Sequence, residues 1–383
     1  MSQKVVVVYG TRPEAIKLAP VVRALRRRAK WCEVTLCATA QHRDLLDQVH
    51  RLFDLAPDID LDLMEPGQAL NSLTARAFGA LDAMLTETTP DWLIVQGDTT
   101  SAMVAALAAF HRGIPVGHVE AGLRTGDLAR PFPEEMNRRV VDLVARAHFA
   151  PTAHAHATLV AEGVPADRIF LTGNTVVDAL QAIAARLDPP APARTDEVLV
   201  TIHRRESFGE PIAGLFGAIG DLARRYPALR WVCPVHPNPE VTAPAREILA
   251  GIPNIDLLPP LDYPELVGRL RRCRLVLTDS GGIQEEAPTF ATPVLVLREA
   301  TERPEGLWAG VARLVGVDRQ RIVEATAELL DDGAARARMS ASANPYGDGL
   351  AAERIAAILC GQPWRPFASE LPNRDPVFGP LVS

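Results

Sequence analysis

The stretch Thr278-Asp279-Ser280-Gly281-Gly282-Ile283-Gln284-Glu285-Glu286 places a hydroxyl and two glycines directly after the apolar run 274–277. The run predicts a buried parallel strand, and the residues after Gly282 predict a helix. A helix that opens at Ser280 leaves free backbone N–H groups, and glycine lets an anion approach them closely. Glu286, one turn further, is placed to accept hydrogen bonds from ribose hydroxyls. The stretch therefore predicts a nucleotide phosphate site, although an ordinary strand-to-helix turn uses similar residues.

Short β-branched runs alternate with alanine- and leucine-rich segments along the 383-residue chain. This alternation predicts parallel sheets covered by helices on both faces. The expected strands are Val5–Tyr9, Val34–Ala38, Trp92–Val95, Val116–Val119 and His148–Ala150 in the first half, then Val198–Ile202, Trp231–Val235, Ile255–Leu258, Leu275–Leu277 and Val294–Leu297. Because the length suits two domains, we expect an α/β protein with two doubly wound units that face a cleft.

Composition excludes several classes of partner. The net charge of −7 argues against nucleic acid or an acidic membrane surface as a partner. No apolar run approaches a membrane span, and the four valines after Lys4 are too few for a signal peptide. The five cysteines are scattered and lack paired metal spacing. They predict buried thiols in a cytoplasmic, reducing compartment, with no disulfide and no metal.

Charged residues gather directly after the expected strands, where the carboxyl ends of parallel strands meet at one edge of a sheet. In the first half these residues are Arg12, Lys17, Asp98, Glu120, Glu134 and Arg138. In the second half they are His203, Arg204, His236, Arg298, Glu302 and Arg303. Each has a simpler explanation when taken alone: Asp98 as a helix cap, Glu120 as a partner of Arg124, His203 as a hydrogen-bonded histidine. Together they predict a carboxylate cluster in the first half and an anion site in the second.

A nucleotide diphosphate site that faces carboxylates suggests chemistry at the sugar carbon that bears the diphosphate. A glycosyltransferase or an epimerase would use such a cleft. No Gly-x-Gly-x-x-Gly fingerprint follows the first strand, so an epimerase here would act without a nicotinamide cofactor. Inversion at C2 of the sugar would then couple proton loss to departure of the diphosphate, which requires several acid/base groups around one ring.

A series of motifs runs in order from Val5 to about Glu353. They are Gly10–Lys17, Gly97–Thr100, His118–Arg124, Pro133–Arg138, Thr172–Thr175, His203–Glu206, Asp279–Pro288, Thr301–Pro304 and Asn344–Gly349. Jointly these motifs resemble the non-hydrolysing UDP-N-acetylglucosamine 2-epimerases of bacteria. The resemblance implies two Rossmann-like domains of the glycosyltransferase-B architecture. Residues 1–170, with a last helix at about 365–383 that crosses back, would form the first, and residues 171–364 the UDP-binding second.

The resemblance also implies an activity and an assembly. It implies reversible conversion of UDP-GlcNAc to UDP-ManNAc through 2-acetamidoglucal and enzyme-bound UDP, in a homodimer, without metal or NAD. Alternatives are a 2-epimerase of a related UDP-2-acetamido sugar such as a 2,3-diacetamido uronate, a hydrolysing epimerase, a glycosyltransferase of the same fold, and a sugar-nucleotide sensor without activity. The sensor is disfavoured because Asp98, Glu120 and Glu134 are all present.

Roles carry over motif by motif. The catalytic candidates are Asp98, Glu120, Glu134 and His203, the last also as a contact to UDP. The other expected contacts to UDP or phosphate are Arg12, Lys17, Arg138, Ser280, Gly281, Gly282, Glu286 and Arg303. A second UDP-GlcNAc would bind as an activator at Gln41, His42, Arg204 and His236. Gly67 stands where certain relatives have an arginine, and leucines of the segment 260–266 lie where some relatives place polar or aromatic groups near uracil.

Overall fold

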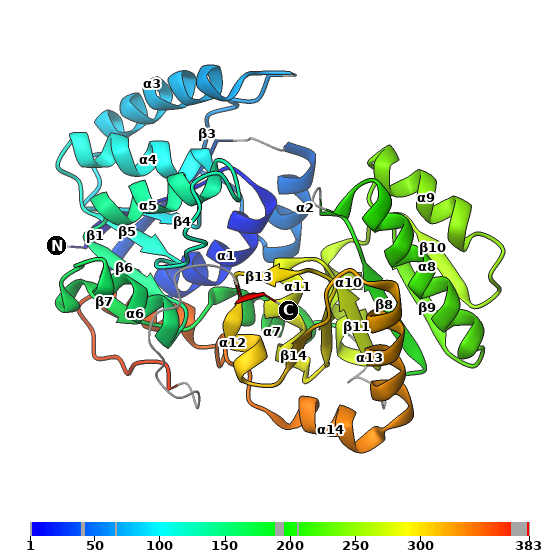
Figure 1. Ribbon diagram of the computed structural model, residues 1–383. Coiled ribbons are helices and arrows are strands. Elements are labelled where there is room, and N and C mark those ends of the chain that lie inside the picture. Colours follow the sequence, from blue (N-terminus) through cyan, green and yellow to red (C-terminus); the bar gives the residue numbers. More distant parts are fainter. Residues whose placement is uncertain are drawn as a thin grey trace. The chain divides into compact units, whose positions relative to one another are not determined.

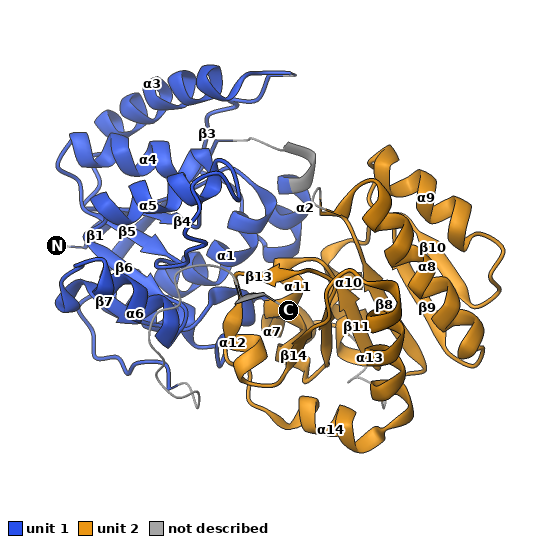
Figure 2. Ribbon diagram, viewed as in Figure 1, with its two compact units in different colours: residues 1–179, 346–379 blue, residues 180–345, 380–383 orange. Residues whose placement is uncertain are grey.

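The computed structural model describes residues 2–39, 43–65, 67–187, 195–204, 207–368 and 381–382. The chain divides into two compact units (Figure 2), which are residues 1–179 with 346–379, and residues 180–345 with 380–383. We call them unit 1 and unit 2. The first division falls inside helix α7 (Thr175–Ala184), later in the chain than the predicted boundary at residue 170.

One helix of the last 40 residues belongs to unit 1. It is α15 (Ala351–Leu359), which packs against α1 (Arg12–Arg26), whereas a helix was expected at about 365–383. Residues 365–368 are not helical, and residues 369–380 lie outside the described part of the chain. Gly361, with φ of +63°, ends α15, and two prolines at 363 and 366 oppose a new helix because proline lacks the backbone N–H.

Unit 1 is built on a parallel sheet in the order β3-β2-β1-β4-β5-β6-β7 (Figure 1). The strands are β1 (Gln3–Tyr9), β2 (Cys32–Ala38), β3 (Ile59–Asp60), β4 (Trp92–Gln96), β5 (Val116–Val119), β6 (Ala147–Ala150) and β7 (Ile169–Leu171). The other helices are α2 (Arg43–Phe53), α3 (Leu70–Thr88), α4 (Thr100–His111), α5 (Glu134–Val144) and α6 (Ala153–Ala161). The five strands predicted for this half are confirmed, while β3 and β7, of two and three residues, were missed.

Unit 2 repeats the plan in the order β10-β9-β8-β11-β12-β14. Its strands are β8 (Glu197–Thr201), β9 (Arg230–Pro234), β10 (Ile255–Leu258), β11 (Leu275–Thr278), β12 (Val294–Val296) and β14 (Ala312–Leu314). Its helices are α8 (Glu210–Arg225), α9 (Pro239–Leu249), α10 (Tyr263–Arg272), α11 (Gly281–Glu286), α12 (Pro304–Trp308), α13 (Arg319–Asp331) and α14 (Gly333–Ala341). The five predicted strands are again confirmed. A short antiparallel pair, β13 (Ala300–Thr301) with β15 (Leu381–Val382), was not predicted.

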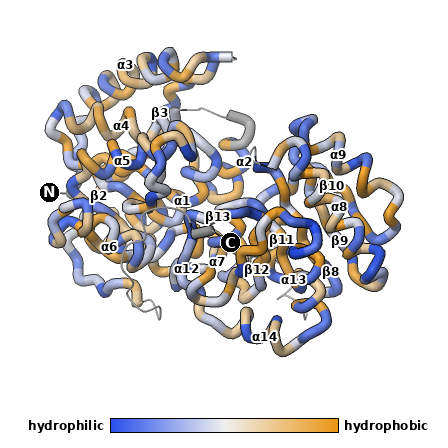
Figure 3. The backbone as a smooth tube through the Cα atoms, in the orientation of Figure 1, coloured by the Kyte–Doolittle hydropathy of each residue, from blue (hydrophilic) through white to orange (hydrophobic). Residues whose placement is uncertain are grey.

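The central strands are buried on both faces, because helices cover both sides of each parallel sheet. Val5 to Val8 of β1 are at most 1% exposed, and Leu275 to Leu277 of β11 are fully buried. Helix α4 is almost entirely buried and correspondingly apolar (Figure 3). Four of the cysteines are buried and Cys360 is half-buried, all as free thiols. Among the described helices, none is long and apolar enough to cross a membrane.

Candidate active site

Each sheet has one point at which neighbouring strands continue into connections on opposite sides. These switch points lie between β1 and β4 in unit 1 and between β8 and β11 in unit 2. Ligands of open α/β sheets bind beyond the carboxyl ends of the strands at such points. The predicted residues divide between the two units: Arg12, Lys17, Asp98, Glu120, Glu134 and Arg138 in unit 1, and His203, Ser280, Gly281, Gly282, Glu286 and Arg303 in unit 2.

Glu14 fixes the loops at the switch point of unit 1. Its side chain is almost fully buried, and one carboxylate oxygen accepts hydrogen bonds from the backbone N–H groups of Gly10 (3.0 Å) and Thr11 (2.7 Å). The other oxygen accepts a 2.7 Å bond from the hydroxyl of Thr99, and burial raises the pKa of Glu14. Thr11 and Glu14 also form a capping box at the start of α1. Thr99 caps α4, so Asp98 is left for another role.

Asp98 and Glu120 each pair with a cation. Asp98 contacts Arg138, and Glu120 contacts Lys17. The Glu120 side chain is 7% exposed, and its backbone φ of 68° is in the left-handed region, which is unfavourable for a residue other than glycine. Such strain clusters at functional sites. The simpler explanation for Glu120, an ion pair with Arg124, is wrong, since Arg124 instead contacts Asp142 and Glu162.

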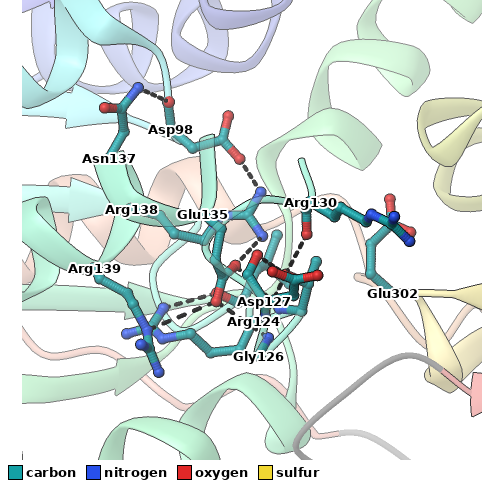
Figure 4. A network of polar contacts seen from close by, with 12 residues as sticks. Asp98, Arg124, Gly126, Asp127, Arg130, Glu135, Asn137, Arg138, Arg139 and Glu302 are labelled. Atoms are coloured by element: carbon teal, nitrogen blue, oxygen red, sulfur yellow. Dashed lines mark hydrogen bonds and ion pairs between the residues drawn. The ribbon is translucent and has the colours of Figure 1, made fainter. Parts of the chain in front are cut away.

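Glu134 opens α5 with one carboxylate oxygen buried and without a hydrogen-bond partner among the described residues. The Nε of Arg138, one helical turn later, is also buried and has no hydrogen-bond partner among the described residues. The Nη groups of Arg138 contact the carboxylates of Asp98 and Glu135 (Figure 4). Leaving a buried polar atom unsatisfied costs roughly 1–3 kcal/mol, and such atoms in folded proteins call for an explanation. A bound ligand would supply the missing partner.

Asp279 organises the switch point of unit 2. It is fully buried after β11 and accepts hydrogen bonds from the backbone N–H groups of His203 and Arg204, each at 2.9 Å. The Nδ1 of His203 lies 3.5 Å from Asp279, and its ring stacks on His236 at 6.1 Å between centroids. Burial lowers the pKa of His203, Asp279 opposes the shift, and the positive charges of Arg204 and His236 add to it. The histidine is therefore held mainly neutral beside two other potential cations.

The two glycines of α11 differ in their surroundings. A Cβ atom at Gly281 would lie 3.2 Å from the guanidinium of Arg204 and 3.3 Å from that of Arg303. A Cβ atom at Gly282 would meet only the Oγ of Ser280, at 3.8 Å, and Gly282 is exposed. Ser280 is the N-cap residue of α11, and its side chain makes no capping hydrogen bond. The loop thus combines an open backbone surface with two adjacent guanidinium groups, as an anion site requires.

Glu302 anchors these guanidinium groups, a role that sequence reasoning missed. Its carboxylate contacts Arg303 at 2.8 Å, Arg298 at 2.8 Å and Arg204 at 3.7 Å. Burial alone would raise the pKa of Glu302, but the three arginines hold that pKa well below its usual range. Glu285 contacts the Nε of Arg303 at 3.0 Å. The sequence feature that could have revealed this role of Glu302 is the unusual density of arginines and glutamates between residues 298 and 303.

The remaining predicted residues are placed as follows. Glu286 is half-buried, with the hydroxyl of Tyr263 at 3.5 Å. Arg12 begins α1 and is half-buried. Of the four residues expected to bind an activator, Gln41 and His42 lie outside the described residues. Arg204 and His236 lie beside the glycine loop and His203 respectively, so their role as an activator site stays a prediction.

Two Rossmann-like α/β units, each with charged loops at its switch point, define an enzyme of the glycosyltransferase-B fold class, and the predicted fold class is confirmed. A family model described as UDP-N-acetylglucosamine 2-epimerase matches residues 23–360. The chain is 48% identical over 369 residues to a UDP-N-acetylglucosamine 2-epimerase of Yersinia pestis, covering 93% of this chain and 98% of that protein. The chain belongs to the UDP-N-acetylglucosamine 2-epimerase family, and the predicted resemblance is confirmed.

Solved structures agree with this assignment. One is the UDP-GlcNAc 2-epimerase of Neisseria meningitidis bound to UDP-GlcNAc, with 41% identity and a TM-score of 0.88 over 94% of this chain and 100% of that one. Another is S. aureus MnaA with UDP, with 42% identity and a TM-score of 0.85 over 93% of this chain and 96% of that one. The prediction that the chain is an enzyme of this isomerase family is confirmed.

Proposed function

We propose that this protein catalyses reversible inversion at C2 of UDP-GlcNAc, giving UDP-ManNAc, by elimination and re-addition of UDP. In the first step C2 loses its proton to a base while the C1–O bond breaks and its electrons leave with UDP. The C1=C2 double bond of 2-acetamidoglucal forms. In the second step a proton adds to the opposite face of C2 and UDP bonds to C1 again. Membership of the family supports the overall reaction.

Unit 1 supplies the acid and base groups of the proposal. The proton leaves one face of C2 and returns to the other, so the reaction needs more than one positioned proton carrier. Asp98, Glu120 and Glu134 are three carboxylates at the switch point of one sheet. The observation that carries the proposal is the buried, unpartnered oxygen of Glu134, because structural ion pairing cannot account for it.

Unit 2 supplies the groups that stabilise the departing diphosphate. Its negative charge grows as the C1–O bond breaks, so fixed donors aimed at it lower the barrier. The backbone at Gly281 and Gly282 offers N–H groups, and Arg303 offers a guanidinium fixed by Glu302 and Glu285. His203 adds a ring beside the same loop, and Glu286 is assigned to the ribose.

Incubation with UDP-GlcNAc in deuterium oxide, followed by proton NMR, tests the proposal. We expect UDP-ManNAc that carries deuterium at C2, without added NAD or metal and at a rate that a chelator leaves unchanged. The Glu134→Gln protein serves as the control for exchange that the enzyme does not catalyse. Epimerisation without uptake of deuterium, or a strict need for NAD, would refute the mechanism. Activity only on another UDP-2-acetamido sugar would keep the mechanism and change the substrate.

We also propose a cytoplasmic homodimer that binds a second UDP-GlcNAc as an activator. Exposed apolar side chains of unit 1 support association, since Leu143 of α5 is 84% exposed and Phe110, near the end of the otherwise buried α4, is 56% exposed. Light scattering after size exclusion should give twice the 41.4 kDa of one chain. Activation would appear as a sigmoidal dependence of the rate on UDP-GlcNAc and loss of the reverse reaction when only UDP-ManNAc is supplied.

A further inference from the structure

His118, on β5, is fully buried and lies between two hydrogen-bond acceptors. Its Nδ1 is 2.6 Å from a carboxylate oxygen of Asp142, and its Nε2 is 2.8 Å from the backbone carbonyl oxygen of Gly97. Gly97 directly precedes Asp98, one of the proposed acid/base residues. Asp142, on α5, also contacts Arg124 at 2.8 Å and accepts a 3.3 Å hydrogen bond from the N–H of Gly122, two residues after Glu120.

The proton count at His118 follows from these contacts. A carbonyl oxygen only accepts hydrogen bonds, and an ionised carboxylate also only accepts them. Asp142 contacts the guanidinium of Arg124 at 2.8 Å and accepts a hydrogen bond from the N–H of Gly122, and both contacts favour the ionised carboxylate. A neutral imidazole has one N–H and would leave one short contact between two acceptors. Only the doubly protonated ring donates at both positions.

The charges around His118 also favour a doubly protonated ring. A chain of ion pairs runs from Asp98 to His118 within unit 1, part of it visible in Figure 4. In order it contains Asp98, Arg138, Glu135, Arg139, Glu162, Arg124, Asp142 and His118. Four carboxylates alternate with three guanidinium groups, so an imidazolium at His118 balances the chain. The contact of His118 with Gly97 then closes the chain into a ring beside Asp98.

Neighbouring groups on every packed element are compatible with this charge. His148, which pairs with His118 across β5 and β6, lies 2.9 Å through its Nε2 from the backbone carbonyl oxygen of Asp142 and 3.3 Å through its Nδ1 from that of Arg168. Both ring nitrogens of His148 therefore face backbone carbonyl oxygens. Asp142 is the carboxylate that contacts the ring of His118.

We propose that His118 is a positioning residue of the reaction, held as a buried imidazolium that fixes the Gly97–Asp98 peptide through its carbonyl. Asn137 fixes the next backbone carbonyl, since its side-chain amide donates a 2.9 Å hydrogen bond to the carbonyl oxygen of Asp98. Asp142 extends the same support to the Glu120–Gly122 turn. The inference rests on the proposed function, in which Asp98 and Glu120 act on the sugar.

The charge state is tested on the wild-type protein by NMR of ¹⁵N-labelled histidine. The signals of His118 are identified as those missing from the His118→Gln protein. At neutral pH we expect a proton on both ring nitrogens of His118, as its contacts with the two acceptors require. A single N–H on this ring at that pH would overturn the inference, whether or not the protein epimerises UDP-GlcNAc.

The positioning role is tested with a matched pair of variants. His118→Asn keeps a donor near Asp142 and removes the donor to Gly97, whereas His118→Gln keeps a donor that reaches Gly97. We expect His118→Asn to lower kcat by about 10- to 100-fold, since a small misplacement of a reacting group has effects of this size. We expect His118→Gln to retain several-fold more kcat than His118→Asn, and both to bind UDP within about twofold of wild type. His156→Asn, on α6 and outside the ring of charges, is the control.

The outcomes separate this inference from the proposed function. A wild type that fails to epimerise UDP-GlcNAc refutes the proposed function, and the NMR result then decides the state of His118 by itself. A folded His118→Asn protein with wild-type kcat refutes the positioning role. If neither His118 variant folds, Asp142→Asn provides the second test. Without the carboxylate, His118 loses the acceptor that orients its ring, so kcat should fall, and an Asp142→Asn protein with unchanged kcat would contradict the inference.

Discussion

The two units use one topology for opposite electrostatic purposes. In unit 1, the proposed acid/base residues Glu120 and Asp98 contact the cations Lys17 and Arg138. At the switch point of unit 2, one carboxylate, Glu302, gathers three guanidinium groups beside an open glycine backbone. The fold places loops at the same edge in both units, but side chains decide whether that edge handles protons or anions. Variants should therefore separate turnover from UDP affinity unit by unit.

The largest effect is expected for the carboxylates of unit 1. Asp98→Asn, Glu120→Gln and Glu134→Gln should each lower kcat by roughly 10²-fold or more, because each removes a general acid or base. UDP affinity, measured by calorimetry, should change much less than kcat, since the glycine loop and Arg303 of unit 2 remain intact in these variants. Normal turnover in all three variants would show that the assignment of unit 1 is wrong.

These variants should also differ in stability. Asp98→Asn removes one of the two carboxylates that contact Arg138, and Glu120→Gln removes the negative charge beside Lys17, so the melting temperature should fall. Glu134→Gln breaks no hydrogen bond at its buried oxygen, so its melting temperature should stay close to that of wild type. A strong loss of stability in Glu134→Gln would indicate a structural role for Glu134 instead.

The next largest effect concerns Arg303 in unit 2. Arg303→Ala should weaken UDP binding by about 1.5–3 kcal/mol, roughly 10- to 100-fold in Kd, because it removes a charge-assisted donor next to Gly281. Arg313→Ala is the matched control, since Arg313 forms an exposed ion pair with Glu328 in the same unit. Calorimetry with UDP measures both. Equal affinities of the two variants would remove Arg303 from the anion site.

The two glycines of α11 offer a smaller and more local comparison. Gly282→Val should fold normally, because the added atoms begin in open space, yet they should obstruct the anion and weaken UDP binding several-fold. Gly281→Ala should weaken binding by displacing the guanidinium groups of Arg204 and Arg303. Unchanged UDP affinity of a folded Gly282→Val protein would show that residues 280–282 form an ordinary turn and not an anion site.

The smallest effect is a dependence of stability on pH in unit 1. Burial raises the pKa of Asp178 to about 7, even though the backbone N–H groups of Ala351 and Ala352 donate to it. Its contribution to stability is therefore fully present below about pH 4 and is lost as the pH rises through 7. We expect Asp178→Asn to melt a few degrees above wild type at pH 8, with the difference shrinking toward pH 4. Calorimetry at both pH values measures it.

Glu302 in unit 2 should give stability the opposite dependence on pH. Because its pKa is held below the usual range, its contribution to stability is present at neutral pH and is lost only as the pH falls into the acid range. Glu302→Gln should accordingly lower the melting temperature at pH 7. If Asp178→Asn and Glu302→Gln shifted the melting temperature in the same direction at pH 7–8, the opposite pKa shifts assigned to Asp178 and Glu302 would be wrong.

The sequence by itself determined the ten predicted strands, the capping box at Thr11 and the glycine loop after β11. These features follow from local rules, since the apolar run, the cap and the turn each lie within a few residues. The motifs also identified the family and the residues now placed at the two switch points. Short elements such as β3 and the position of the returning helix α15 were not predicted, because tertiary packing decides them.

Only the tertiary structure decided how the charges pair. Lys17 reaches Glu120 across 103 positions of sequence, and Arg138 reaches Asp98 across 40. No local rule selects such partners, because their distance depends on the order of the strands in the sheet. The same holds for the three arginines around Glu302 and for His118 between Asp142 and Gly97. Residue types predicted the kind of chemistry. The folded chain decided which charges neutralise one another, and it left a buried oxygen of Glu134 without a hydrogen-bond partner among the described residues.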